Sequence, residues 1–137
     1  MNRIKISLNF YLNEFECPCC QRVKIDEILL WKLEALRIIW GMPLRVTSGY
    51  RCEKHNKEVG GAENSLHLRG RAVDIAVKEE DQGKFLTLAK LVGFKVIPYP
   101  KRNFVHLDVG GEGLGRISGD IESRVSNSPE LLPFNPS

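Results

Sequence analysis

Hydrophobic residues recur at helical spacing in two long stretches of the chain. In "KIDEILLWKLEALRIIWG" they form one stripe, with Asp26 placed to cap the start of a helix and Gly41 placed to end it. In "EEDQGKFLTLAKLVGF" a second stripe ends at Gly93. This spacing predicts two amphipathic helices whose apolar stripes pack into a core.

Four shorter stretches predict β-strands. Two of them, "RAVDIAV" and "RNFVHLDVG", alternate between two faces, and "PLRVTSG" and "FKVIPYP" predict two more. Between "PLRVTSG" and "RAVDIAV", the stretch "CEKHNKEVGG" predicts a helix of one or two turns. This order of elements predicts an α+β fold, with helices packed on one face of a small, largely antiparallel sheet.

The size and composition of the chain fit one globular domain. It has 137 residues, of which 42% are hydrophobic and 27% are charged. After Gly110, the glycines and the final "SNSPELLPFNPS" are too polar and proline-rich to build a core. We therefore expect a folded domain over residues 1–118 and a loosely ordered C-terminal tail over residues 119–137.

Charge and hydropathy narrow the class of partner. The net charge of +3 is mild, and no basic helix is interleaved with aromatic residues, so we expect no nucleic-acid partner. No apolar run approaches the roughly 20 residues that a membrane span needs, and the N-terminus has no apolar segment typical of a signal peptide. We expect a monomer made in the cytoplasm, which works outside the cell only if something else releases it.

The strand predicted at "RAVDIAV" places a carboxylate among apolar residues. Val73, Ile75 and Val77 point to one face of this strand, and Asp74 points to the other. An unpaired buried carboxylate is costly enough that it normally has a partner or becomes protonated. Asp74 therefore needs a partner on the polar face of the sheet.

Two histidines complete a candidate metal site with this aspartate. His106 lies on the polar face of the last predicted strand, and His67 lies shortly before Asp74 in the sequence. Two imidazoles and one carboxylate, with a fourth position left to water, are typical of hydrolytic zinc sites. Zinc would neutralise Asp74 and lower the pKa of a water beside it. The alternative is that hydrogen bonds alone satisfy both histidines.

The four cysteines form a second group of candidate metal donors. Cys17 and Cys20 of "CPCC" have C-x-x-C spacing, and Cys52 with His55 has C-x-x-H spacing. Together they fit a structural zinc site of three cysteines and one histidine. Two alternatives stay open: reduced, partly buried thiols, and a disulfide between Cys52 and one N-terminal cysteine.

The histidine and aspartate motifs resemble those of a known enzyme family. "SGYRCEKHNKEVGGAENSLHLRGRAVDI", followed by "FVHLD", is similar to the S-G-Y-R, S-x-H-x-x-G-x-A-x-D and late-histidine pattern of the zinc D-alanyl-D-alanine carboxypeptidase family of peptidoglycan peptidases (peptidase M15, most similar to its subfamily A). The similarity runs from about Phe10 through Asp108. It implies a fold of the hedgehog and DD-peptidase type, and it implies His67, Asp74 and His106 as zinc ligands.

The same resemblance implies an activity and its partners. Members include small phage lytic enzymes, or endolysins, and bacterial wall-remodelling enzymes, and the signal-less N-terminus fits the phage type. We expect hydrolysis of an amide bond in the peptidoglycan stem peptide: D-Ala-D-Ala, L-Ala-D-Glu or the interpeptide cross-link. The expected cofactor is one catalytic zinc ion, with a second, structural zinc as a further option.

Three residues near the predicted cleft are candidates for substrate contacts. Arg51 matches an arginine that faces the substrate in related enzymes, where its charged donor fork suits a peptide carboxylate or a developing oxyanion. The alternative for Arg51 is a structural ion pair. Ser65 matches the serine of S-x-H and either contacts the substrate or caps the turn. Tyr50 is expected to line the cleft.

The general base is where this sequence departs from several branches of the family. Those branches have an acidic residue three positions before the last histidine ligand, where this chain has Asn103. Other branches have H-x-D, which here is Asp108, on the strand face of His106. Asp108 is expected either to act as the base or to orient a ligand, and Glu112 is a further candidate. The alternative function is a catalytically inactive, zinc-containing module of the hedgehog type that binds wall peptides.

Overall fold

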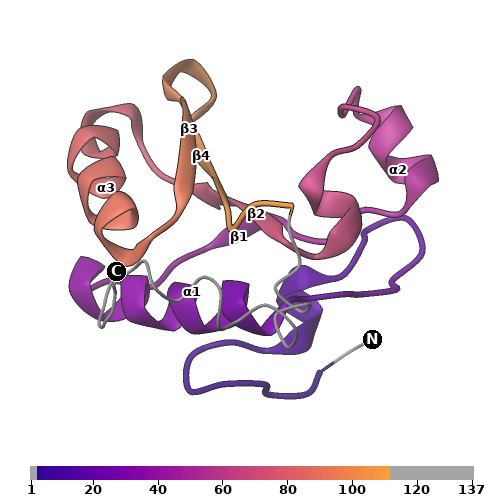
Figure 1. The fold of residues 1–137 in the computed structure, drawn as a ribbon, viewed down its shortest axis with the longest axis horizontal. Coiled ribbons are helices and arrows are strands. Elements are labelled where there is room, and N and C mark those ends of the chain that lie inside the picture. Colours follow the sequence, from indigo (N-terminus) through magenta and orange to yellow (C-terminus); the bar gives the residue numbers. More distant parts are fainter. Residues whose placement is uncertain (1–2, 112–137) are drawn as a thin grey trace, which may run out of the picture.

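Four short antiparallel strands form one sheet in the order β1-β2-β4-β3. The computed structural model describes residues 3–111 (Figure 1), so the predicted domain end at residue 118 and the tail that follows lie outside the described residues. The elements in chain order are η1 (Leu12–Phe15), α1 (Glu27–Trp40), β1 (Val46–Ser48), α2 (Glu53–Glu58), η2 (Leu66–Arg69), β2 (Ala72–Ala76), α3 (Glu79–Val92), β3 (Lys95–Tyr99), η3 (Pro100–Arg102) and β4 (Phe104–Asp108).

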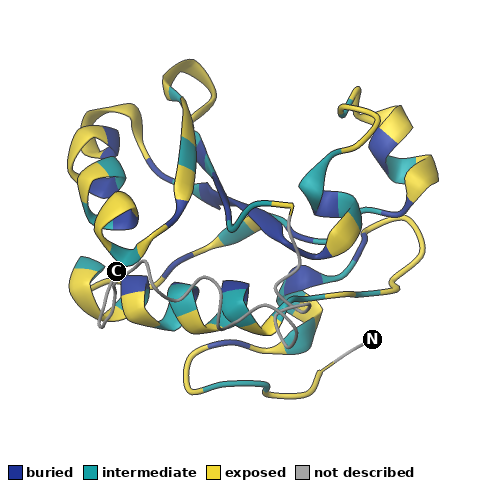
Figure 2. Cartoon of the chain, viewed as in Figure 1, coloured by how far each residue is buried: buried dark blue, intermediate teal, exposed yellow. Residues whose placement is uncertain are grey.

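The two long helices cover one face of this sheet, as the sequence predicts. Figure 1 shows α1 running beneath the strands, with α3 beside them. The core joins these helices to the apolar faces of β2 and β4, whose residues are largely buried (Figure 2). Its central members are Leu29, Leu33, Leu36, Val73, Ile75, Phe85, Ala89, Val105 and Leu107. The α+β prediction is confirmed.

Local signals set the ends of the long helices. Asp26 caps α1, because its side chain accepts a hydrogen bond from Ile28 N at 2.8 Å. Gly41 ends the same helix with a left-handed backbone, and Gly93 does so for α3. Among residues 3–111, no helix is long and apolar enough to cross a membrane.

The strand register brings the polar faces of β2 and β4 together. Asp74 pairs with His106, and Ala72 pairs with Asp108. Since side chains alternate along each strand, Asp74 and His106 share the face that α1 and α3 leave uncovered. The fold therefore turns the polar positions of two strands into neighbours on one open face.

Candidate metal centre

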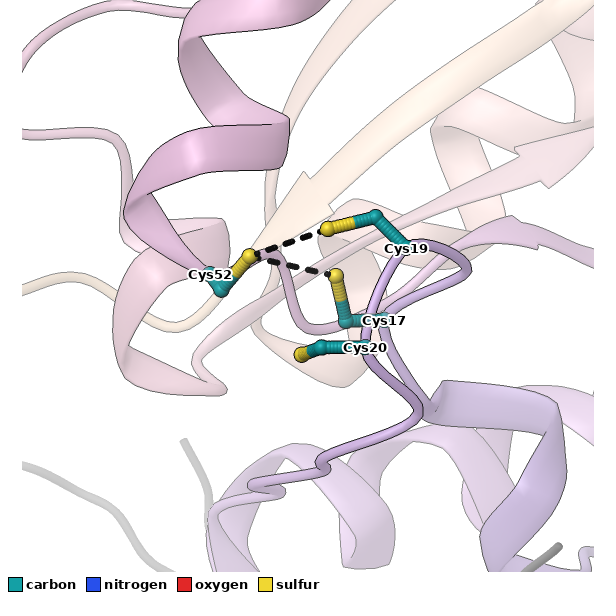
Figure 3. Close-up of side chains that lie close together, drawn as sticks. All are labelled: Cys17, Cys19, Cys20 and Cys52. Carbon is teal, nitrogen blue, oxygen red and sulfur yellow. Dashed lines mark hydrogen bonds between the residues drawn. The ribbon is translucent and has the colours of Figure 1, made fainter.

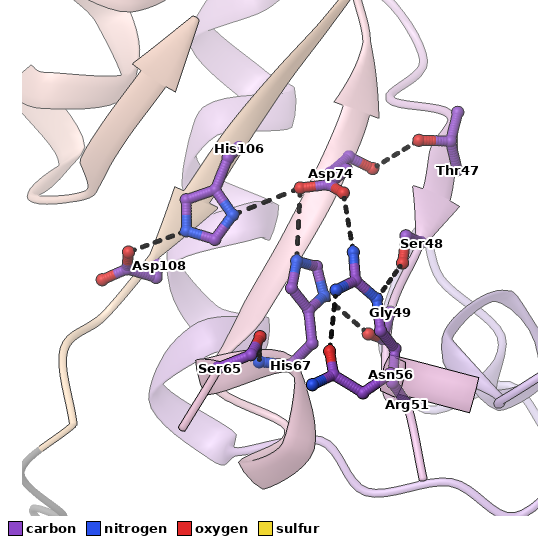
Figure 4. Close-up of polar contacts among 10 residues, drawn as sticks. All are labelled: Thr47, Ser48, Gly49, Arg51, Asn56, Ser65, His67, Asp74, His106 and Asp108. Atoms are coloured by element: carbon purple, nitrogen blue, oxygen red, sulfur yellow. Dashed lines mark hydrogen bonds and ion pairs between the residues drawn. The ribbon is translucent and has the colours of Figure 1, made fainter. Parts of the chain in front are cut away.

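Three donor atoms converge on the open face of the sheet (Figure 4). His67 comes from η2, Asp74 from β2 and His106 from β4. Asp74 Oδ1 lies 3.3 Å from His67 Nε2 and 3.2 Å from His106 Nδ1. The structure thus brings together the three residues that the sequence singles out as metal ligands.

Hydrogen bonds on the outer side of each imidazole fix its orientation. His67 Nδ1 lies 2.8 Å from the carbonyl oxygen of Gly49, so this nitrogen carries the proton and donates it. His106 Nε2 lies 2.9 Å from Asp108 Oδ2 and donates in the same way. In neutral imidazoles, the lone pairs of the inner nitrogens then point at Asp74. Such pairing of metal-binding histidines with carbonyl or carboxylate acceptors is typical of metal sites.

The charges around the cluster favour a cation. Burial acts to raise the pKa of Asp74, but hydrogen bonds with His106 and His67 lower it to about 2. Burial acts to lower the pKa of His106, but hydrogen bonds with Asp108 and Asp74 raise it to about 9. Without a metal ion, the cluster therefore holds a proton at His106, and a bound dication would replace that positive charge.

The separations between the donors fit zinc. Bonds of about 2.0–2.1 Å from zinc to nitrogen and oxygen give a tetrahedron with edges of about 3.3 Å. The two measured nitrogen–oxygen separations, 3.2 and 3.3 Å, match that edge. Two nitrogens and one carboxylate oxygen are also a donor set that zinc prefers. The residues present therefore fit a zinc ion.

A short 3-10 turn, η2, places His67 shortly before β2. The Ser65 side chain caps η2 by accepting a hydrogen bond from His67 N at 3.1 Å, which corresponds to the turn-capping alternative for Ser65. Gly70 ends the turn with φ +70°, and a Cβ there would lie 2.6 Å from the carbonyl oxygen of Lys24. Glycine is therefore required where the chain bends from His67 back into the sheet.

Arg51 holds the second oxygen of Asp74. Its Nη2 lies 3.5 Å from Asp74 Oδ2, which leaves Oδ1 facing the two histidines. Ser48 and Asn56 accept further hydrogen bonds from the same guanidinium, at 3.2 and 3.1 Å. Asn56 was not among the site residues expected from the sequence, although it belongs to "EKHN", which closely follows S-G-Y-R. A Cβ at Gly61 would lie 2.0 Å from Asn56 Oδ1, so glycine leaves the room that this arrangement needs.

The cluster opens into a cavity of about 620 Å³ between two walls. On one side, α2, η2 and the segments that flank them contribute Arg51, His55 and Ser65. On the other side, the β3–β4 hairpin contributes Tyr99 and Arg102, together with Phe104. Tyr99 stacks on Phe104 at 4.5 Å between ring centroids, with the Arg102 guanidinium 5.2 Å from the Phe104 ring.

Tyr50 is not among the described residues that line this cavity, so its expected place in the cleft stays a prediction. Its backbone N–H donates to the carbonyl oxygen of Phe15, and its ring lies 5.8 Å from Lys24 Nζ. The S-G-Y-R turn therefore brings Ser48 and Arg51 to the cavity, whereas Tyr50 contacts Phe15 and Lys24.

The candidates for the general base have different surroundings. Asp108 accepts from His106 with one oxygen and from Gly110 N, at 2.9 Å, with the other, so both oxygens are engaged. Asn103 occupies a left-handed turn, φ +54°, and its side chain accepts from Glu79 N at 2.9 Å. Its amide thus caps the start of α3. Glu112 lies outside the described residues.

The cysteines gather differently from the predicted set (Figure 3). The sulfur atoms of Cys17, Cys19, Cys20 and Cys52 form one group of donors, and all four are free thiols in the structure. This group contains three residues of the expected set, Cys17, Cys20 and Cys52, with Cys19 in addition, whereas His55 forms a neighbouring group with Cys19 and Glu58. The imidazole of His55 lies on the neighbouring side, 3.8 Å from a carboxylate oxygen of Glu58.

Comparisons with known proteins agree with these features. The family model for peptidase M15 matches residues 8–108. Over 90 residues, the chain is 34% identical to a zinc D-Ala-D-Ala carboxypeptidase of Streptomyces albus G, which corresponds to 63% of this chain and 35% of that protein.

Hedgehog proteins are also similar to this chain. Indian hedgehog protein of Gallus gallus and Sonic hedgehog protein of Danio rerio are each 37% identical to it over 75 residues. These matches cover 53% of this chain and 17% of each hedgehog protein. The chain therefore spans about a third of the length of the carboxypeptidase and about a sixth of the hedgehog proteins.

Proposed function

Because the chain belongs to the peptidase M15 family, we propose that it is a zinc-dependent peptidase that hydrolyses an amide bond in the peptide stem of peptidoglycan. The similarity to a zinc D-Ala-D-Ala carboxypeptidase supports both the metal and the class of substrate. D-Ala-D-Ala, L-Ala-D-Glu and the interpeptide cross-link are the candidate bonds. The proposed site of action is the cell wall or periplasm, reached after release from the cytoplasm.

One observation carries this proposal: two oriented imidazoles face one carboxylate oxygen at 3.2 and 3.3 Å, on a surface that opens into a cavity. Zinc held by His67, Asp74 and His106 would act as a Lewis acid toward the scissile carbonyl and would lower the pKa of an attacking water. Three donors that leave one position open are the arrangement that hydrolytic zinc sites use.

The residues around this cluster then have distinct roles in the proposal. Asp108 keeps a proton on His106 Nε2 and so keeps Nδ1 available as a donor. Since both oxygens of Asp108 are engaged, we assign it to positioning His106 rather than to direct removal of a proton from water. Arg51 lines the cavity beside Asp74, where its guanidinium suits a substrate carboxylate or the negative charge that develops on the carbonyl oxygen.

The walls of the cavity suit an acidic peptide. Arg51 and Arg102 both line it, and the stacked rings of Tyr99 and Phe104 add an apolar surface. Stem peptides present free carboxylates next to small apolar side chains, which matches such a lining. We therefore expect peptides with a carboxylate near the cleaved bond to be better substrates than their amidated forms.

The second candidate function is a zinc-containing module that binds wall peptides without cleaving them. The similarity to hedgehog proteins favours it, and so do the structural role of Asn103 and the engaged oxygens of Asp108. Binding without turnover would then be expected.

Digestion of purified peptidoglycan separates the two functions. The zinc-loaded chain is incubated with peptidoglycan, and the soluble products are identified by mass, with the His67→Ala variant as control. A peptidase releases products whose new termini name the bond, and the variant releases none. Peptidoglycan that binds the protein but yields no products would support the binding module.

A further inference from the structure

A second group of candidate metal donors lies outside the cavity. The sulfur atoms of all four cysteines lie within 4.8 Å of one another, with Cys52 Sγ 3.6 Å from Cys17 Sγ and 3.4 Å from Cys19 Sγ. A zinc ion with bonds of about 2.3 Å to sulfur holds its ligands about 3.8 Å apart at the corners of a tetrahedron. The measured separations are close to that edge.

A tight loop directs three of these sulfurs toward the fourth. Cys17 N donates to the carbonyl oxygen of Arg22 at 2.8 Å, and Gln21 N donates to the carbonyl oxygen of Cys17 at 2.7 Å. Gln21 has φ +63°, a conformation that is uncommon without glycine. Figure 3 shows the side chains of Cys17, Cys19 and Cys20 on this loop, close to Cys52. The backbone is therefore arranged around the sulfur cluster.

Burial of apolar surface explains the positions of only two of the four cysteines. Cys17 and Cys52 are buried and behave as small apolar side chains would. Cys19 and Cys20 are exposed, so their convergence on Cys52 removes little apolar surface from water. Shared coordination of a metal ion explains both pairs at once.

Hydrogen bonds to the sulfurs suit thiolates. Arg22 Nε donates to Cys20 Sγ at 3.5 Å, and His55 N donates to Cys52 Sγ at 3.4 Å. Four thiolates around a dication leave a net charge of about −2, from the charges of the ligands and the ion. The guanidinium of Arg22 offsets part of that charge, and such outer donors are typical partners of metal-bound sulfur.

We propose that Cys17, Cys19, Cys20 and Cys52 bind one structural zinc ion as four thiolates. Four S–H bonds are replaced by four S–Zn bonds, and the four protons leave to solvent, so the step needs no oxidant or reductant. With no position left open, this ion has a structural role.

The second zinc ion would support the catalytic cleft. Cys52 directly follows Arg51 in the sequence, and it caps the start of α2. The ion therefore ties the loop before α1 to the turn that aims Arg51 at Asp74. This inference is independent of the proposed peptidase activity, because a binding module would use the same ion to hold the same turn.

Cobalt substitution tests the ligand set on the full chain. The protein is stripped of metal under reducing conditions and loaded with Co²⁺, whose thiolate complexes have intense sulfur-to-cobalt charge-transfer absorption in the near ultraviolet. The nitrogen and oxygen donors of the other centre cannot produce this band. We expect it in the wild type and in His67→Ala. We expect its loss in Cys19→Ser and Cys20→Ser, whose exposed side chains can be replaced without disturbing the core.

Zinc content, measured on the same variants, gives a second test of the ligand set. The wild type should hold two zinc ions per chain, and the Cys19→Ser and Cys20→Ser variants should each hold one. His55→Ala is the control, because it removes the neighbouring histidine and leaves all four sulfurs in place. This variant should keep both ions. If His55→Ala loses an ion that Cys19→Ser keeps, the four-sulfur site is wrong.

Two other results would overturn the proposal. One is a cobalt-loaded wild type without the charge-transfer band. The other is a chain, purified without oxygen and then unfolded with chelator, in which two of the four thiols do not react with a thiol reagent, since that indicates a disulfide. A His67→Ala variant that retains full zinc content would instead contradict the proposed function and leave the cysteine site intact.

Discussion

Asp108 Oδ2 lies 2.9 Å from His106 Nε2, on the side of the imidazole opposite Asp74. His106 is thus held between two carboxylates, one in the candidate metal cluster and one behind it. Since Asp108 also accepts from Gly110 N, its position is fixed by the backbone that follows β4. This relationship supports the proposed role of Asp108 in orienting His106.

Replacing Asp108 should weaken zinc binding more than it changes the chemistry. In Asp108→Ala the imidazole loses its outer acceptor, and we expect zinc affinity to fall by about 10- to 100-fold, the usual cost of losing such a partner. Asp108→Asn keeps an oxygen that accepts from His106 and should lose less. Competition with a chelator of known affinity measures both. If Asp108→Asn binds zinc normally yet has no activity at saturating zinc, Asp108 is the general base instead.

Removal of Arg51 should affect turnover without removing the metal. We expect Arg51→Ala to lower kcat/KM by about 10²- to 10³-fold, the scale for losing one donor to developing negative charge. Zinc content should be unchanged, because the guanidinium contacts Oδ2 of Asp74, whereas Oδ1 is the oxygen that faces the two histidines. Arg45→Ala removes an exposed arginine outside the cavity and serves as control. If Arg51→Ala loses zinc or folded protein but keeps normal activity per zinc-loaded molecule, the role of Arg51 is purely structural.

Asn103 should matter for stability and not for catalysis. Asn103→Ala removes the acceptor at Glu79 N and places an alanine in a left-handed turn that disfavours it, so we expect a cost of about 1–2 kcal/mol in the free energy of unfolding. Urea denaturation measures this cost. Activity per folded molecule should equal that of the wild type. A large loss of kcat in a folded Asn103→Ala variant would instead give the amide a part in the reaction.

The metal-free protein should become less stable as the pH rises toward 9. Although burial opposes a charge on His106, its two carboxylate partners raise its pKa to about 9, above the value of 6.5 for an unperturbed imidazole. The charged form therefore stabilises the fold, fully at pH values below about 6.5 and decreasingly as the pH rises through 9. Denaturation of chelator-treated protein across this interval, compared with His106→Gln, measures the effect. Wild-type stability that rises with pH relative to the variant would contradict it.

Local and periodic features of the fold could be predicted from the sequence. The ends of α1 follow from Asp26 and Gly41, because capping depends on residues close in the chain. The polar face of the sheet follows from alternation around Asp74 and His106, since the period of a strand is fixed. The position of His67 beside these residues was less constrained by alternation, because the spacing between His67 and Asp74 does not define the turn that Gly70 makes. The family motif was needed to support it.

Features that depend on distant contacts could not be predicted. C-x-x-C and C-x-x-H spacing suggested Cys17, Cys20, Cys52 and His55 as one set, but the loop closed by Cys17 and Arg22 also brings Cys19 to the other three sulfurs, and this depends on the folded loop. Asn103 was considered only as a missing acid, since its contact with the start of α3 depends on how the β3–β4 hairpin packs. The carbonyl oxygen of Gly49, which orients His67, belongs to the backbone, so no side-chain pattern in the sequence signals it.

The most direct test of the central claim measures zinc content and release of peptides from peptidoglycan on the same samples of wild type and His67→Ala. The account predicts that the variant loses one zinc ion per chain and, with it, all soluble products, while the wild type releases peptides with new termini at one bond. A variant that keeps the zinc content and the products of the wild type would contradict the account, because the cluster around Asp74 would then hold no catalytic metal.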